Sequence, residues 1–352
     1  MRVLIDTTYA ERAPLSGTAI YLERLIAALA KHPDLEILTT ANTRRNPPAG
    51  GGAGSVRNFA EDLRWTHSSL PREAARVKAE LIHHPLPAVS LAPGLPQVIT
   101  VHDLAFERCP EAFDRRFRLY ARIAHRLAAR RADAVVAVSE TTAADLGELW
   151  RVAPEKIVVA HHGLGQSLPR VPQTRGRHLL YVGDDEPRKD LPTLLAAYAR
   201  YRDSAAQPLE LVLAGPAGPP GAGATSPAPG VRHEHDPTPR RLSELYAGAI
   251  ALVHPARYEG FGMTLAEAMA LAVPIIAARS PAAEEVCGPA AHYVWPGNPV
   301  ELAAALTRIT TDPALRNRLS GRGRERASGF SWARSAARHR DAYSLALKTI
   351  RQ

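Results

Sequence analysis

The amino-acid sequence predicts an α/β protein with two doubly wound parallel-sheet domains. With 352 residues, the chain is longer than one ordinary domain and can bury two hydrophobic cores. Short aliphatic runs alternate with amphipathic segments along most of the chain, as strands alternate with helices in such sheets. This series pauses over residues 166–177 and then starts again. We therefore expect one domain on each side of this linker.

The first series predicts one parallel sheet. Buried strands are expected at residues 3–5, 37–38, 81–83, 98–101, 134–138 and 157–159. Ser16 and Gly17 open a helix with apolar residues at helical spacing, and Ser139 is expected to cap a helix that begins at Thr141.

The second series predicts another sheet, with strands at residues 179–182, 209–214, 249–254 and 274–278. Residues 331–352 are expected to form a closing helix. Residues 45–54 and 215–230 are rich in Pro, Gly and Ala, which predicts two mobile loops.

Composition excludes several classes of protein. The two cysteines, Cys109 and Cys287, lie far apart, which argues against a disulfide framework or a zinc knuckle. The opening residues favour a first strand over a signal peptide, and residues 265–278, the longest mostly apolar stretch, are too short to cross a bilayer. We expect a cytoplasmic protein. The formal net charge of +9 favours anionic partners, which include nucleic acid, membrane surfaces and phosphorylated substrates.

The run from Tyr258 to Glu267 is the most informative motif. It places a glycine turn and a helix start between Glu259 and Glu267, directly after the strand at residues 249–254. Ligands of open α/β sheets bind at the carboxyl ends of strands. The amides of Gly262, Met263 and Thr264 are expected at the helix N-terminus, where unpaired N–H groups and the helix dipole favour a diphosphate. The two glutamates could then reach opposite ends of a nucleotide sugar.

Further polar residues follow other predicted strands. Arg188 and Lys189 come after the strand at residues 179–182 and could bind phosphate oxygens. His102 and Asp103 end the strand at residues 98–101, where the imidazole could hydrogen-bond a transferred sugar, although a structural histidine is the common alternative. Gly17 either lets backbone approach a phosphate or serves a plain turn.

Two clusters could suggest a metal site, but we predict none. Beside residues 184–186, Arg188 and Lys189 already supply the positive charge that a metal ion would bring. Residues 233–236 carry alternate histidines, yet Pro237 and Pro239 flank them, so a surface loop is expected.

The segment over residues 114–131 predicts a basic amphipathic helix. Arg118, Arg122, Arg126 and Arg130 recur every fourth residue, with Phe117, Tyr120, Ile123, Ala124 and Leu127 opposite them. Such a helix could touch anionic lipid as a peripheral membrane element. The ordinary alternative is a solvated arginine face above apolar residues that the domain core needs.

These motifs resemble the GT-B fold glycosyltransferases of family 4, a retaining group. The resemblance covers nearly the whole chain and is carried by Ser16-Gly17, residues 101–104, residues 138–140, residues 183–189 and above all Glu259 to Glu267. It implies two Rossmann-like domains that face each other across a cleft. Residues 1–168 with the helix 335–352 would bind the acceptor, and residues 169–334 would bind the nucleotide sugar.

The resemblance also implies roles for individual residues. Arg188 and Lys189 would hold the diphosphate, Glu259 the sugar hydroxyls and Glu267 the ribose, while His102 would contact the sugar. Gly17 and the amides after Gly262 would complete the phosphate cradle. The other substrate-binding positions of the matched motifs are Asp103, Gly183, Gly260, Phe261, Met263, Thr264 and Leu265. Retention through same-face attack is implied, with no metal and no cofactor.

The predicted function is transfer of a hexose from a nucleoside diphosphate sugar to a bacterial glycan, a lipid-linked acceptor or a small molecule. A related alternative is an epimerase or hydrolase of sugar nucleotides on the same fold. A nucleic-acid or membrane binding module is a third class that the arginine surplus allows, although we do not expect nucleic acid as a partner. A dinucleotide oxidoreductase is disfavoured, because no strand is followed by Gly-x-Gly-x-x-Gly.

Overall fold

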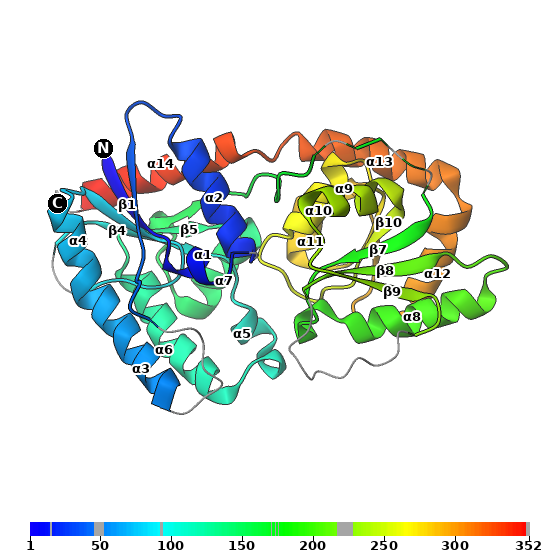
Figure 1. Ribbon diagram of the computed structural model, residues 1–352, viewed down its shortest axis with the longest axis horizontal. Helices are drawn as coiled ribbons and strands as arrows, with labels where there is room; N and C mark the ends of the chain where they lie inside the picture. The colour runs from blue at the N-terminus through cyan, green and yellow to red at the C-terminus, as the bar shows by residue number, and fades with distance from the viewer. Residues whose placement is uncertain are drawn as a thin grey trace. The chain divides into compact units, whose positions relative to one another are not determined.

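The computed structural model describes residues 1–14, 16–45, 53–91, 94–169, 171–172, 174, 176–216 and 228–349. The chain divides into two compact units. Unit 1 consists of Met1–Glu107, Phe113–Gly163 and Trp332–Gln352, and unit 2 of Arg108–Ala112 and Leu164–Ser331. Each unit holds a six-stranded sheet with helices packed on it (Figure 1). The predicted α/β class with two doubly wound, Rossmann-like parallel sheets is confirmed.

The sheet of unit 1 has the strand order β2-β1-β3-β4-β5-β6, and all its pairs are parallel. Its strands are β1 (Arg2–Asp6), β2 (Glu36–Thr40), β3 (Leu81–His84), β4 (Gln97–Val101), β5 (Ala134–Ala137) and β6 (Ile157–Val159). Its α-helices are α1 (Thr8–Arg12), α2 (Gly17–Leu29), α3 (Ala53–Arg64), α4 (Leu70–Arg76), α5 (Ala105–Arg108), α6 (Arg115–Arg131), α7 (Glu140–Trp150) and α14 (Trp332–Thr349).

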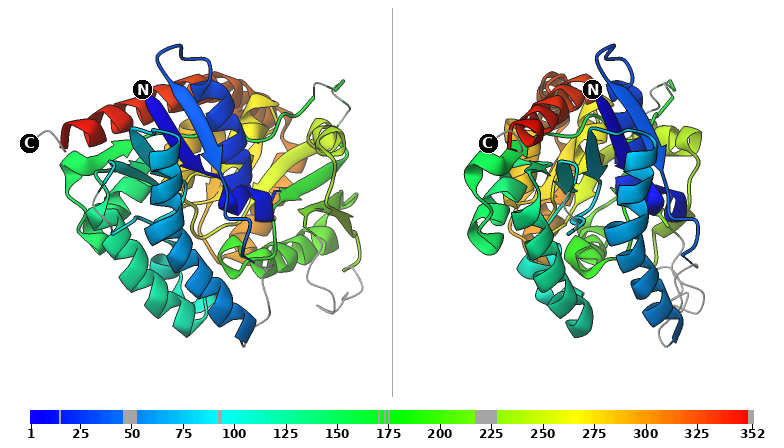
Figure 2. Two further views of the ribbon diagram at one scale, coloured as in Figure 1. Left: turned by 60° about the vertical axis from the view of Figure 1, so that its left-hand side comes forward. Right: turned by 90° about the vertical axis from the view of Figure 1, so that its left-hand side faces the viewer.

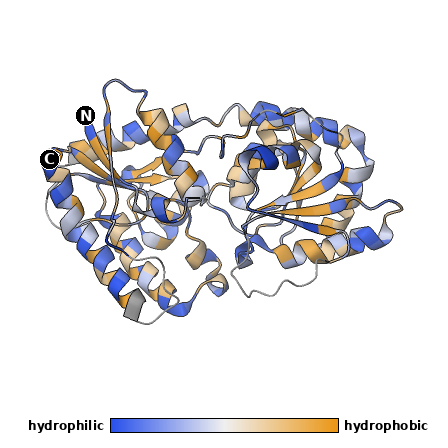
Figure 3. Cartoon of the chain, viewed as in Figure 1, coloured by the Kyte–Doolittle hydropathy of each residue, from blue (hydrophilic) through white to orange (hydrophobic). Residues whose placement is uncertain are grey.

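Both faces of this sheet are covered by helices. Because successive side chains of a strand point to opposite faces, consecutive residues of one strand pack in different clusters. Val3 and Ile5 pack in one cluster with α2 and α14. Leu4, between them, packs in another cluster with Leu70 and Ala74 of α4. The strands are accordingly apolar along most of their length (Figure 3).

A chain of buried hydrogen bonds attaches α14 to the sheet. His339 Nδ1 lies 2.7 Å from the carbonyl oxygen of Ser335, so this nitrogen carries the proton and Nε2 accepts from the Tyr21 hydroxyl at 2.9 Å. The Thr100 hydroxyl then donates to the Tyr21 oxygen at 2.8 Å and accepts from His83 Nε2 at 2.9 Å. His83 Nδ1 in turn accepts from the Tyr343 hydroxyl at 2.9 Å. Neutral imidazoles satisfy every step of this network.

The sheet of unit 2 has the strand order β12-β11-β10-β7-β8-β9, again entirely parallel. Its strands are β7 (His178–Val182), β8 (Glu210–Gly215), β9 (Val231–His235), β10 (Ala249–His254), β11 (Ile275–Ala278) and β12 (Ala291–Val294). Its α-helices are α8 (Leu191–Ser204), α9 (Pro239–Gly248), α10 (Met263–Ala270), α11 (Pro281–Cys287), α12 (Pro299–Thr311) and α13 (Pro313–Ala327).

Two strands at the edges of this sheet were not predicted. In β9 only Val231 is buried, and in β12 only Ala291 and Val294 are buried, so neither strand has the aliphatic run of a central strand. The prediction of a surface loop at residues 233–236 is wrong, because His233 to His235 belong to β9. Asp236 alone has left the strand, with φ of 45°.

Other local predictions can also be compared with the structure. Ser139 caps α7 by accepting a hydrogen bond from the Thr142 amide at 2.9 Å, although the helix begins at Glu140 rather than Thr141. The described part of the linker over residues 166–177 contains neither helix nor strand. The two predicted mobile loops lie largely outside the described residues, which leave out 46–52 and 217–227.

The apolar face of the basic helix is not a core face. In α6 the buried residues are Ala121, Ala128 and Ala129. The larger apolar side chains are exposed instead, and Ile123 is 64% exposed. The expectation that this apolar stripe fills the domain core is therefore wrong, because three alanines already bring the helix backbone close to its neighbours.

Candidate functional site

Strand order brings two loops next to each other at the carboxyl end of the unit 2 sheet. β7 and β10 pair directly, with Leu179 beside Ala251 and Leu180 beside Leu252. β8 and β9 continue the sheet beyond β7, whereas β11 and β12 continue it beyond β10. The strand order therefore reverses between β7 and β10, which is where open α/β sheets form a ligand crevice at their carboxyl ends. The loops after these two strands carry Arg188, Lys189 and Glu259.

Glu259 lies between two cations in this position. Lys189 Nζ is 2.8 Å from Oε1 of Glu259, and Arg188 Nη1 is 3.0 Å from Oε2. The three side chains are only 10–13% exposed. Glu186, which is more exposed, approaches Nε of Arg188 at 2.6 Å. The structure thus brings together the three residues expected at the carboxyl ends of separate strands.

These neighbours determine the charge of Glu259. Burial alone would raise the pKa of this carboxyl group, but Lys189 and Arg188 act in the opposite direction and hold the pKa well below its usual range. Glu259 is therefore a carboxylate at neutral pH. A carboxylate accepts hydrogen bonds and donates none, so it suits a ligand rich in hydroxyl groups.

His254 completes this cluster, and sequence reasoning missed it. It is the last residue of β10, and its Nε2 lies 3.6 Å from Oε1 of Glu259. The same atom is buried and makes no hydrogen bond within the described part of the chain. Burial lowers the pKa of His254 to about 4, although Glu259 acts to raise it, so the ring is neutral at pH 7. Its place at a strand end is the signal that drew attention to His102.

A second ion pair fastens the two loops to each other. Arg257 donates its backbone N–H to the carbonyl oxygen of Arg188 at 2.9 Å, and its Nε lies 2.8 Å from Oδ2 of Asp190. Asp190 has φ of 53° and accepts a hydrogen bond from the Thr193 hydroxyl at 2.8 Å. The positions of Arg188 and Lys189 are therefore fixed from both sides of the β7–β10 boundary.

The glycine turn after Glu259 leads directly into α10. Gly262 has φ of 90° and precedes the first helical residue, Met263, without any side-chain cap. A side chain at this glycine would be strained, and its Cβ would lie 2.9 Å from Cδ1 of Leu265. Phe261 is buried against Phe330, with ring centroids 5.4 Å apart. The helix N-terminus, with Met263 and Thr264 in its first turn, therefore follows Glu259 as predicted.

Glu267 makes contacts separate from the Glu259 cluster. It is buried, and its Oε2 accepts from the Tyr246 hydroxyl at 3.0 Å while Oε1 accepts from the Gln166 amide at 2.9 Å. Burial raises its pKa, which these two hydrogen bonds partly offset. Neither bond reaches Arg188 or Lys189. Glu267 thus joins α10 to α9 and to the segment that follows Gly165.

Gly165 allows this arrangement because a Cβ there would lie 2.0 Å from Oε1 of Glu267. Replacing Gly165 with alanine must displace either the carboxylate or the backbone that carries the Gln166 amide. We expect the Gly165→Ala substitution to lower the free energy of unfolding by about 1–3 kcal/mol, as losing a buried hydrogen bond does. Urea unfolding measures this change. Gly321→Ala is the matched control, because nothing lies within 4 Å of a Cβ there and alanine favours the helix.

The remaining predicted residues have ordinary local roles as well. Gly183 follows β7 and donates its N–H to the carbonyl oxygen of Ala214 at 2.9 Å. In unit 1, Gly17 is the first residue of α2, and Asp103 accepts from the Ala105 amide at 2.9 Å where α5 begins. His102 Nε2 lies 3.1 Å from the carbonyl oxygen of Pro85, and burial lowers its pKa to about 4.

His102 also belongs to an aromatic group that the sequence did not reveal. Its ring lies edge-on to Tyr21, with centroids 4.8 Å apart, and 5.6 Å from the ring of His162. His162 stacks on Trp332 of α14 at 5.5 Å. His102 therefore contacts α2 through Tyr21 and the segment after β6 through His162, and His162 connects the group to α14.

The segments considered as metal sites form ion pairs instead. Glu186 pairs with Arg188, and Glu234 pairs with Arg232 and Arg241. Among the residues that the structure describes, no three His, Cys, Asp or Glu side chains are grouped as metal ligands would be. No helix in the described ranges is both long and apolar enough to span a membrane.

Comparison with protein families identifies both halves of the chain. The model described as "Glycosyltransferase Family 4" matches residues 15–165, and the model described as "Glycosyl transferases group 1" matches residues 170–326. Together they span most of unit 1 and nearly all of unit 2.

Several curated proteins are similar in sequence. "MMP alpha-(1->4)-mannosyltransferase" of Mycolicibacterium hassiacum is 33% identical over 63% of this chain and 56% of its own length. "O-antigen chain mannosyltransferase B" of Escherichia coli is 26% identical over 70% of each chain. "D-inositol 3-phosphate glycosyltransferase" of Streptomyces bingchenggensis is 29% identical over 63% of this chain. The chain thus spans little more than half the length of the first and third of these relatives, 56% and 54%.

Solved structures share the fold over the whole chain. Sucrose-phosphate synthase from Thermosynechococcus elongatus matches 98% of both chains with a TM-score of 0.80 at 20% identity. The Anabaena protein HepE, solved in complex with UDP and glucose, matches 98% of this chain and 99% of its own with a TM-score of 0.70 at 17% identity. WaaG, a glycosyltransferase involved in lipopolysaccharide biosynthesis, also has a TM-score of 0.70 at 18% identity, over 98% of this chain and 99% of its own. The chain has the GT-B fold and belongs to the glycosyltransferases of family 4, with a group 1 domain in its second half.

Proposed function

We propose that this protein is a retaining hexosyltransferase that uses a nucleoside diphosphate sugar as donor. The observation that carries the proposal is the cluster of Arg188, Lys189 and Glu259 at the β7–β10 boundary. In an open sheet this boundary is a preferred ligand crevice. Two largely buried cations next to a carboxylate fit a ligand that has a diphosphate at one end and hydroxyl groups at the other.

The two cations would stabilise the leaving group. As the bond between the sugar and the diphosphate breaks, the anomeric carbon becomes positively charged and negative charge grows on the phosphate oxygens. Cations that are already fixed in place stabilise this charge without reorganising during the reaction. The Arg188 guanidinium could contact two phosphate oxygens, whereas the Lys189 ammonium acts as a point charge. The ion pair between Arg257 and Asp190 helps to keep both groups in place.

Glu259 would bind the hydroxyl groups of the sugar. Its carboxylate balances the two cations before the donor binds, and a diphosphate could then take over part of that charge. Each carboxylate oxygen has further lone pairs, so it can accept from sugar hydroxyls while it remains near Lys189. His254, the neutral and buried last residue of β10, lies beside this carboxylate without adding charge.

The other predicted contacts complete the proposal. Glu267 would bind the ribose hydroxyls through lone pairs that Tyr246 and Gln166 leave unused. The α10 N-terminus and Gly17 would contact phosphate oxygens, and His102 would contact the sugar. Retention would follow from attack on the same face that the diphosphate leaves, with no metal ion and no cofactor.

Two named relatives are mannosyltransferases, and HepE was solved with UDP and glucose, which together support a hexose donor. The names of the relatives span an O-antigen chain and an inositol phosphate, which supports a polyhydroxylated acceptor. A glycan, a lipid-linked sugar and a small molecule all remain in this class. We propose that the reaction takes place in the cytoplasm, where nucleotide sugars are made.

A donor screen followed by a transfer assay tests the proposal. The melting temperature of the protein is measured with UDP-, GDP- and dTDP-sugars, and we expect one donor to raise it by several degrees at saturating concentration. That donor is then incubated with a panel of glycans, and the anomeric configuration of the product is read by NMR. Equal donor consumption with and without acceptor would favour the epimerase or hydrolase. Salt-sensitive DNA binding without donor binding would favour a nucleic-acid binding module.

A further inference from the structure

Two neighbouring helices of unit 1 carry most of the exposed apolar side chains. Thirteen large apolar side chains are exposed among the described residues, and eight of them lie on α3 and α6. They are Val56, Phe59, Leu63, Phe117, Leu119, Tyr120, Ile123 and Leu127. The Phe59 and Tyr120 rings touch edge to face, with centroids 5.4 Å apart, so the two helices contribute to one surface. We call these eight residues, with the arginines between them, the α3–α6 surface. Figures 1 and 2 show the backbone of the two helices that carry it.

One of these helices, α6, is strongly basic, whereas α3 carries two arginines and two acidic residues. α6 contains seven arginines in 17 residues and no acidic residue. Arg122 pairs with Glu107, but Arg115, Arg116 and Arg131 are exposed and make no ion pair within the described part of the chain. Leu119, 63% exposed, lies on the arginine side of α6 rather than on the apolar side. Positive charge and apolar side chains are therefore interleaved on the exposed part of the helix.

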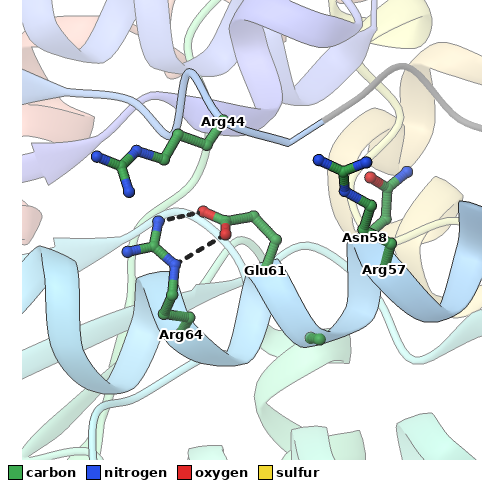
Figure 4. A pocket seen from close by; sticks show the side chains of 6 residues that line it. Arg44, Arg57, Asn58, Glu61 and Arg64 are labelled. Carbon is green, nitrogen blue, oxygen red and sulfur yellow. Dashed lines mark hydrogen bonds and ion pairs between the residues drawn. The ribbon is translucent and has the colours of Figure 1, made fainter.

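A pocket beside α3 adds to this positive charge. It has a volume of about 460 Å³ and is lined by Arg44, Arg57, Asn58, Ala60, Glu61 and Arg64 (Figure 4). Glu61 accepts hydrogen bonds from two guanidinium nitrogens of Arg64, Nη2 at 2.6 Å and Nε at 2.8 Å. The guanidinium groups of Arg44 and Arg57 have no such partner among the described residues and are exposed. None of the residues predicted for sugar transfer lines this pocket.

We propose that the α3–α6 surface binds an anionic lipid bilayer. Exposed Leu, Ile and Phe side chains on a helix lose contact with water when they enter the boundary between headgroups and acyl chains. Arginines next to them interact with the negative surface potential of anionic lipids, by about 1 kcal/mol each. A solvated arginine face explains the charges but leaves the exposed apolar side chains without a reason, because continuous apolar patches of this kind usually mark a binding surface.

Charge complementarity favours lipid over a second copy of the chain. In a twofold dimer, equivalent surfaces would meet, and each would bring the arginines of α6 against those of its partner. α6 has no acidic residue that could neutralise them, and Glu61 and Asp62 of α3 already pair with Arg64 and Arg45. An anionic bilayer offers both the apolar phase and the negative charge that this surface lacks.

Vesicle flotation tests the proposal without donor or acceptor, so its outcome is independent of the proposed sugar transfer. The purified 352-residue chain is mixed with vesicles of phosphatidylcholine alone, or with 30% phosphatidylglycerol added, at low and high salt. We expect binding only to the anionic vesicles, with at least about a tenfold loss in 0.5 M salt. Equal binding to neutral vesicles would overturn the electrostatic part of the proposal.

Matched variants locate the binding surface. The Leu119→Glu/Ile123→Glu double variant is expected to lose binding, and Arg115→Ala/Arg116→Ala to weaken it by at least about tenfold. Val300→Glu and Arg318→Ala/Arg324→Ala are the controls, since these residues are also exposed but lie on α12 and α13. They should bind like the wild type. Unchanged vesicle binding by Leu119→Glu/Ile123→Glu would overturn the proposal. The proposal would also be overturned if the wild type bound no vesicles and formed a dimer in solution that this double substitution dissociates.

Discussion

Replacing Glu259 with alanine is expected to lower kcat/KM for sugar transfer by about 10² to 10³-fold, the range for loss of one fixed polar contact to the transition state. The physical reason is that Glu259 is the only carboxylate that pairs with both Arg188 and Lys189 among the described residues. Without it, no carboxylate between these cations accepts hydrogen bonds from the sugar. The rate is measured with the donor that the thermal screen identifies.

Nucleotide binding should respond differently from the rate. Glu259 competes with a diphosphate for the same two cations, so Glu259→Ala is expected to bind the nucleoside diphosphate at least as tightly as the wild type does. Arg188→Ala removes a cation and is expected to weaken nucleotide binding as well as transfer. Calorimetry with the free nucleotide separates these two effects. A protein that merely unfolds after Glu259→Ala would lose both properties.

Controls make this comparison decisive. Glu244→Ala removes a half-exposed glutamate of α9 that also pairs with two arginines, Arg240 and Arg241, and it should change neither rate nor binding. Glu259→Gln retains the shape of the side chain without its charge, so it should destabilise the folded protein less than Glu259→Ala does. If Glu259→Ala transferred sugar at the wild-type rate, the assignment of this cluster as the donor site would be wrong.

The sequence allowed the members of this cluster to be predicted but not their arrangement. Arg188 and Glu259 each follow an aliphatic run, so local pattern places them at the carboxyl ends of strands. Their proximity depends on the pairing of β7 with β10, and strand order is set by packing across the whole sheet. His254 was missed because it is the last residue of the predicted strand at residues 249–254 and does not belong to the loop that follows. Its place in the cluster becomes clear only in the structure, where the fold brings Glu259 next to it.

The wrong predictions share one physical cause. An aliphatic run identifies a strand that is buried on both faces, and β9 and β12 lie at the edges of the sheet, where fewer apolar residues are needed. Likewise, periodicity showed that α6 is amphipathic but could not show which side faces the core. Small alanines occupy the buried side, and the large apolar residues that dominate the pattern are exposed. Patterns of hydrophobicity report a contrast between faces, whereas burial depends on the neighbours of each face.

The second large effect is expected from His339→Ala, which should lower the free energy of unfolding by about 3 kcal/mol. His339 is completely buried, and its loss leaves a cavity and removes the acceptor of the Tyr21 hydroxyl. The damage extends along the network, because Tyr21 also bonds to Thr100 and thereby to His83. Since His339 lies on α14 and Tyr21 on α2, the substitution weakens the attachment of the last helix to unit 1. Urea unfolding at pH 7 measures the change.

The same residue should alter the response to acid. Burial lowers the pKa of His339 to about 4, whereas a histidine in the unfolded chain titrates near 6.5. Above pH 6.5 the imidazole is neutral in both states and adds no pH dependence. As the pH falls from about 6.5 to about 4, the unfolded chain takes up a proton that the folded chain excludes, so stability falls over this window. His339→Ala cannot take up this proton, and its stability should fall by about 2 kcal/mol less between pH 7 and pH 5.

Asp341→Ala is the matched control on the same helix, because Asp341 is exposed and pairs only with Arg338 among the described residues. It should change stability by less than about 0.5 kcal/mol at either pH. Tyr21→Phe provides a second probe, since it removes the hydroxyl that links His339 to Thr100 without opening a large cavity. If the network acts as a unit, the effects of His339→Ala and Tyr21→Phe will not add, because the two residues share one hydrogen bond. Additive losses, or a His339→Ala variant as stable as Asp341→Ala, would show that α14 is held by apolar packing alone.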